Sequence, residues 1–171
     1  MPARFAYYAR LTKSEQAVYR QSDRVAFVPL GDELDALRAL TAAIEPALRS
    51  EGCDAVRAAS HALCAAICAR LDVRAPSVKV LGVRPRQSDE SELHGLYTTG
   101  PRRRPLIRVW MRTAAKRRVV SFRTFVRTLL HELAHHLDFE LYGLADSYHT
   151  LGFFKRESSL MRQLLPAATS S

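Results

Sequence analysis

The chain has 171 residues, of which 47% are hydrophobic, and a formal net charge of +9. This length and composition predict one globular domain with a core of its own and exclude a disordered chain. No apolar run approaches the roughly 20 residues of a membrane span, and the first residues lack the apolar core of a signal peptide. We therefore expect a cytoplasmic protein with no membrane partner.

The positive charge comes mostly from arginine and would allow electrostatic contact with nucleic acid. However, the sequence contains no helix-turn-helix, zinc-finger or RNA-binding signature. Nucleic acid is thus an alternative partner, secondary to a protein or peptide substrate.

The first part of the chain is expected to be helical. Residues 1–30 are predicted to form an N-terminal arm with a short helix, capped by Thr12 or Ser14. Apolar residues at helical spacing predict two further helices, over residues 31–50 and 54–71, and Pro46 is expected to kink or shorten the end of the first.

A small sheet is predicted to follow. Alternating and β-branched residues predict strands over 77–83, 93–99 and 105–111, with a polar loop over 85–92. The turn between the last two strands predicts an antiparallel pair. The strand 105–111 is expected to have a free edge, which would bind an extended substrate by strand addition.

Two more helices complete the predicted domain, which spans residues 31–166. Ser121 is expected to cap a helix over 121–142, and Thr150 to cap the last helix. Residues 167–171 are expected to be a disordered tail. The predicted fold class is α+β, with N-terminal helices, a small and mostly antiparallel sheet, an active-site helix and a C-terminal helix.

The predicted helix over 121–142 contains a His-Glu-x-x-His motif. His131 and His135 are four residues apart, so they lie on one face of the helix, about one turn apart. Two imidazoles with one further protein ligand and an open position favour zinc. Glu132 is placed to reach a water on the metal, as the general base of a zinc hydrolase does.

A third protein ligand is required downstream, and two residues qualify. His149 follows the helix in a short connection, whereas Glu157 lies in the last helix. Asp138 is seven residues after the first histidine and is expected to orient a ligand or a neighbouring loop. Tyr148 and Arg156 lie near His149 in the sequence and are candidate oxyanion donors.

Residues 75–160 resemble a small zincin of the SprT-like type. In that family a strand pair leads into the His-Glu-x-x-His helix, and a His-x-x-x-Phe segment follows, which here is His149–Phe153. The resemblance implies a zincin-like fold with Glu132 as the catalytic base and three zinc ligands, His131, His135 and His149.

One residue departs from the SprT-like pattern, and a second family offers an alternative third ligand. Thr150 stands where the family usually has glycine. The minimal gluzincins are the rival family, and their third ligand is a glutamate from a downstream helix, for which Glu157 is the candidate.

The sequence therefore predicts a zinc metallopeptidase that hydrolyses peptide bonds with a zinc-activated water and Glu132 as general base. Two alternatives remain open. One is a DNA-associated protease of the SprT-like type, suggested by the charge of +9. The other is a non-catalytic binding module stabilised by zinc.

Overall fold

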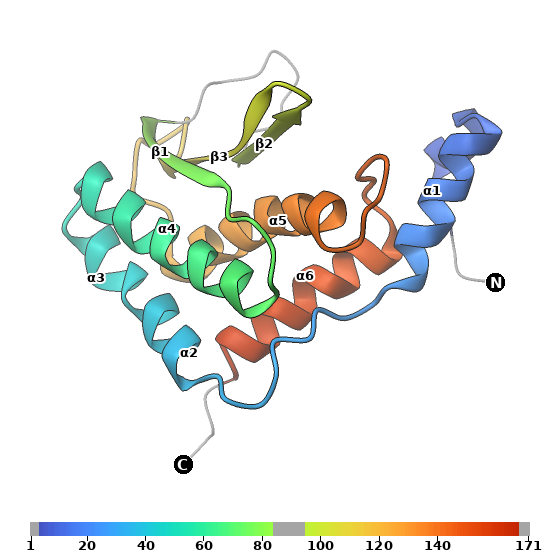
Figure 1. Ribbon diagram of the computed structural model, residues 1–171. Coiled ribbons are helices and arrows are strands. Elements are labelled where there is room, and N and C mark those ends of the chain that lie inside the picture. The colour runs from blue at the N-terminus through green and yellow to red at the C-terminus, as the bar shows by residue number, and fades with distance from the viewer. Residues whose placement is uncertain (1–3, 84–94, 168–171) are drawn as a thin grey trace.

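The computed structural model describes residues 4–83 and 95–167, and its elements form an α+β fold (Figure 1). The predicted loop over 85–92 and nearly all of the predicted tail lie outside the described residues. The helices are η1 (Ala6–Arg10, a 3-10 helix), α1 (Lys13–Arg24), α2 (Asp35–Ala42), α3 (Ile44–Arg49), α4 (Cys53–Arg70), α5 (Phe122–Glu140) and α6 (Leu151–Leu164). The strands are β1 (Ser77–Val83), β2 (Gly95–Gly100) and β3 (Arg103–Arg112).

Most helix predictions are confirmed, and their caps explain where the helices begin. Thr12 caps α1 in a capping box with Glu15, so Thr12 is the cap of the two residues considered. Ser121 accepts a hydrogen bond from the backbone of Thr124 at the start of α5, and Thr150 accepts one from Phe153 at the start of α6.

The helix predicted over 31–50 is divided in two, since α2 ends at Ala42 and α3 begins at Ile44, so the expected effect of Pro46 is a break between two helices. Pro46 is the physical reason. Proline has no backbone N–H, and its ring collides with the carbonyl four residues earlier, so it is tolerated only in the first turn of a new helix.

The sheet is mixed, which corrects the expectation of a mostly antiparallel one. Its strand order is β1-β3-β2, with β1 parallel to β3 and β2 antiparallel to β3. The predicted antiparallel pair is therefore confirmed, but β3 also takes β1 as its neighbour. As the central strand, β3 has no free edge, and among the described residues β2 is an edge strand of the sheet beside α5.

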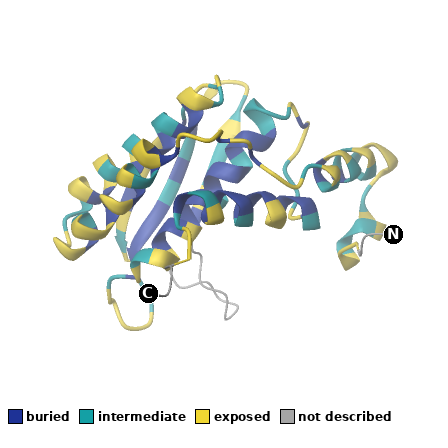
Figure 2. Cartoon of the chain, turned by 90° about the horizontal axis from the view of Figure 1, so that it is seen from below, coloured by how far each residue is buried: buried dark blue, intermediate teal, exposed yellow. Residues whose placement is uncertain are grey.

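The helices form layers beneath the sheet. α4 packs on β1, and α5 packs on β2 and β3, while α2 and α3 lie against α4 and α6 lies against α5 (Figure 1). Figure 2 shows that buried residues gather where these layers meet, while the region near the N-terminus is more exposed. No helix within the described ranges is long and apolar enough to cross a membrane.

The predicted N-terminal arm packs along α6. α1 contacts one end of α6, and the extended chain that follows α1 runs along the same helix. The backbone of Val28 donates a hydrogen bond to the hydroxyl of Ser159, and Gln163 bonds the carbonyl of Val28. The arm thus reaches the segment that follows the His-Glu-x-x-His helix.

Candidate metal centre

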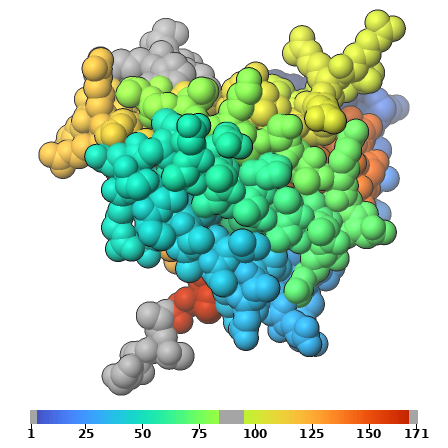
Figure 3. All heavy atoms as spheres, turned by 60° about the vertical axis from the view of Figure 1, so that its left-hand side comes forward, coloured from blue at the N-terminus to red at the C-terminus, as the bar shows by residue number. Residues whose placement is uncertain are grey.

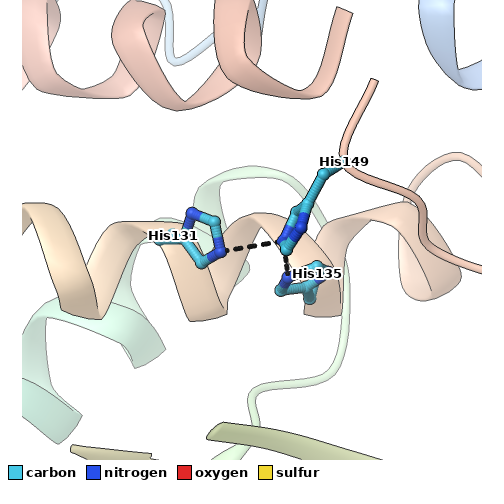
Figure 4. A group of neighbouring side chains, drawn as sticks. All are labelled: His131, His135 and His149. Carbon is cyan, nitrogen blue, oxygen red and sulfur yellow. Dashed lines mark hydrogen bonds between the residues drawn. The ribbon is translucent and has the colours of Figure 1, made fainter. Parts of the chain in front are cut away.

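Three histidine side chains converge at the surface of α5 (Figure 4). His131 and His135 project from adjacent turns of α5, and His149 reaches them from the connection between α5 and α6. The Nε2 atom of His149 lies 3.1 Å from Nε2 of His131 and 3.0 Å from Nε2 of His135. A tetrahedral zinc ion with Zn–N bonds of about 2.0–2.1 Å places its nitrogen ligands about 3.3 Å apart, so the spacing fits one shared ion.

The partner of His131 fixes which of its ring nitrogens carries a lone pair. Nδ1 of His131 lies 2.8 Å from Oε2 of Glu157, whose other oxygen is 3.7 Å from Nη1 of Arg127. A carboxylate only accepts hydrogen bonds, so Nδ1 carries the proton. In the neutral ring Nε2 then has a lone pair, directed at the other histidines.

The same logic applies to His135. Its Nδ1 lies 2.7 Å from Oγ of Ser147, and that hydroxyl donates its own proton to Oδ2 of Asp138, 2.7 Å away. The hydroxyl therefore accepts from His135, whose Nε2 has a free lone pair. Two lone pairs directed at one point cannot satisfy each other, and this donor set suits a cation.

The surroundings of His135 and His149 favour the neutral imidazole, which is the form that binds metal. Burial lowers the pKa of His135 to about 3, and the neighbouring His131 and His149 lower it further. The pKa of His149 is also lowered, first by partial desolvation, although the residue as a whole is exposed, and then by His131.

Asp138 belongs to a buried ion pair behind the histidines. Its Oδ1 accepts a hydrogen bond of 2.9 Å from Arg156, and both side chains are at most 1% exposed. Arg156 also donates to the backbone carbonyls of Ser22 and Val25, which precede and follow the end of α1. A buried charge is tolerated when it is paired and hydrogen-bonded in this way.

Glu132 is buried beside β2 at the side of the histidine cluster. Burial raises the pKa of its carboxyl to about 7, against the opposing effects of His131 and of a backbone hydrogen bond from Tyr97. Gly95 makes this packing possible, because a Cβ at that position would lie 2.8 Å from both Cγ and Oε1 of Glu132. A carboxyl with a pKa near neutrality is suited to accept and return a proton.

The three histidines and Glu132 line a cleft of about 960 Å³ between β2 and α5. Its wall on the side of the sheet is the whole of β2 up to Thr99. Its wall on the side of the helix runs from Thr124 to Phe139. β2 thus lines the same cleft as the histidines.

The other residues singled out from the sequence lie around this cluster. Glu157 bonds His131, whereas the group that could hold an ion consists of the three histidines. Arg156 is fully buried, and neither it nor Tyr148 lines the cleft, so the structure does not support an oxyanion role for them. Tyr148 instead lies beside the ring of Tyr19, with centroids 6.3 Å apart.

Sequence reasoning missed Ser147 and Gly95. Ser147 lies in an irregular connection, where no periodicity marks a functional side chain. Gly95 is close to Glu132 only because β2 packs on α5, which no local pattern predicts. His136, the third histidine of α5, contacts Tyr97 and the carbonyl of Arg74 and lies outside the cluster.

No protein-family model, no curated protein and no solved structure matches this chain.

Proposed function

We propose that this chain is a zinc-dependent metallopeptidase of the zincin type. The observation that carries the proposal is the convergence of three Nε2 atoms, in which those of His131 and His135 lie 3.1 and 3.0 Å from that of His149. His131 and His135 have hydrogen-bond partners that direct their lone pairs inward, and a buried glutamate lies alongside in a cleft. Three histidine ligands are the kind of donor set that catalytic zinc sites use, with the fourth position left to water or substrate.

His131, His135 and His149 would hold the metal. Zinc, when bound, supplies Lewis-acid chemistry, which makes water acidic near neutral pH and polarises a carbonyl group. Glu132 would remove a proton from the attacking water and deliver it to the leaving amine. Its raised pKa, about 7, lets the same carboxyl perform both steps near neutrality.

The substrate class that best fits the cleft is an extended peptide. Among the described residues, β2 pairs only with β3, and its residues Gly95–Thr99 line the cleft. A peptide that adds to this strand would gain backbone hydrogen bonds and would pass the histidines. The SprT-like assignment stays a proposal of the same kind, since it depends on the motif and on the position of His149.

The proposal is tested by comparing the wild type with Glu132→Gln on a mixture of unfolded proteins and peptides. The variant keeps all three ligands, so zinc content measured by mass spectrometry should not change. Cleavage should disappear. A non-catalytic zinc module predicts the opposite outcome, in which the variant matches the wild type in every assay.

A DNA-associated protease is the second candidate function. The turn between β2 and β3 projects from the surface (yellow in Figure 3), and three arginines in the turn and at the start of β3 are exposed: Arg102, Arg103 and Arg104. Together with the charge of +9, they would contact phosphates. Retention on DNA that falls steeply between about 50 and 200 mM salt would support this function, and no retention at the lower salt would remove it.

A further inference from the structure

The N-terminal segment contacts the third histidine directly. The hydroxyl of Tyr7 donates a 2.9 Å hydrogen bond to the backbone carbonyl of His149, across 142 positions of sequence. His131 and His135 are fixed by α5, a helix packed under the sheet, but His149 is exposed and comes from the connection to α6. A ligand on such a connection needs support from elsewhere to stay in place.

α1 holds the residues that follow His149. The hydroxyls of Ser22 and Thr150 are 3.0 Å apart, and Oδ1 of Asp23 accepts a 2.9 Å hydrogen bond from the backbone of Gly152. The approach is so close that a Cβ on Gly152 would lie 2.5 Å from the carbonyl oxygen of Ser22. The start of α6 therefore sits directly on the end of α1.

Aromatic packing joins the same two regions. Phe5 lies edge-on to Phe154 at a centroid distance of 6.1 Å, and Phe154 stacks on the ring of His149 at 5.6 Å. Tyr7 in turn stacks with Phe5 and packs against Tyr19 of α1. The backbone of His149 is thus contacted directly by Tyr7, and its imidazole is linked to Phe5 through the ring of Phe154.

We propose that residues 5–24, through Tyr7, position His149 for metal binding, so that this segment controls the affinity of the centre. The inference rests on the proposed zinc site. Tyr7 is a positioning residue, because it touches the backbone of a ligand and not the metal. Without its hydrogen bond the His149 carbonyl is freer to move, and zinc binding must restrain it again.

The test compares Tyr7→Phe with a matched control, Tyr8→Phe. Each variant removes one hydroxyl from the same helix, η1, but the Tyr8 hydroxyl bonds only Arg20 of α1, at 2.7 Å, among the described residues. Zinc affinity is measured by competition with a chromophoric chelator. The visible spectrum of the Co²⁺ form reports the geometry of the ligands.

Tyr7→Phe should lose roughly three- to tenfold in zinc affinity and should change the intensity or position of the Co²⁺ bands. Tyr8→Phe should match the wild type in both. Equal affinities and spectra for the two variants would overturn the inference while leaving the zinc site intact. A wild type that binds no zinc would overturn the proposed function itself.

A second measurement uses the wild type alone and does not depend on how the variants fold. Coupling between two sites is reciprocal, so zinc should stabilise the N-terminal segment as much as the segment stabilises zinc binding. Amide hydrogen exchange in residues 5–24 should slow on zinc addition. Unchanged exchange in this segment, with zinc bound at the histidines, would contradict the inference.

Discussion

Replacement of Gly95 by alanine should separate catalysis from metal binding. The new Cβ would lie 2.8 Å from Cγ and Oε1 of Glu132 and 3.0 Å from Cγ2 of Thr128. Carbon atoms in contact are about 3.5–4.0 Å apart, so the overlap with Cγ is about 0.7 Å or more. Either β2 or the carboxylate must then move by nearly 1 Å.

A displacement of about 1 Å at a reacting group costs on the order of 100-fold in rate. We therefore expect Gly95→Ala to lower kcat/KM for a peptide substrate by about that factor. The zinc content should not change, because the substitution touches none of the three histidines. Peptide turnover and metal analysis on the same sample provide the assay.

Gly100→Ala is the matched control, since it adds the same methyl group to the same strand at a point where, apart from its chain neighbours, no heavy atom of the described residues lies within 4 Å of the new Cβ. Its turnover should equal that of the wild type. If Gly95→Ala were as active as Gly100→Ala, Glu132 would not be the base packed beneath β2. Loss of zinc in Gly95→Ala would likewise refute the reasoning.

Three further predictions follow from the buried groups. Burial raises the pKa of Glu132 from 4.5 to about 7, so ionisation of this carboxyl opposes folding. In chelator-treated protein, the free energy of unfolding of the wild type should therefore fall by about 3 kcal/mol relative to that of Glu132→Gln as pH rises from 4.5 to 7. Denaturant titrations measure this difference, and a difference that stays constant with pH would contradict the prediction. Ser147→Ala removes the acceptor of the His135 Nδ1 proton and should weaken zinc binding about 10- to 100-fold, as measured by chelator competition. An unaltered zinc affinity would show that the hydrogen bond from His135 to Ser147 does not support the metal site. Arg156→Met leaves the Asp138 carboxylate buried without its partner and should cost about 3–5 kcal/mol of unfolding free energy, and a loss below 1 kcal/mol would show that the pair adds little.

The helices and the motif were predictable because their signals are local. α5 begins after a serine cap and carries apolar residues at helical spacing, so its bounds and the shared face of His131 and His135 follow from the sequence. Asp138 illustrates the limit of such spacing arguments. Its position seven residues after His131 suggested a supporting role, but its hydrogen bond to Ser147 depends on how the next connection folds back.

Non-local pairing explains most of what the sequence could not predict. The turn between β2 and β3 identifies one strand pair, but no residue indicates that β3 would also pair with β1. Whether His149 or Glu157 lies next to the Nε2 atoms of His131 and His135 also depends on where α6 packs. Likewise, the bond from Tyr7 to His149 joins two segments 142 positions apart, and neither carries a motif for it.

The presence and ligands of the metal are tested most directly by an anomalous difference map at the zinc absorption edge, from crystals of protein prepared with zinc. We expect a single peak about 2.0–2.1 Å from Nε2 of His131, His135 and His149, with Glu157 still bonded to Nδ1 of His131. No peak at the three histidines would contradict the zinc centre. A peak bound by Glu157 in place of His149 would contradict the ligand set and the positioning role of Tyr7.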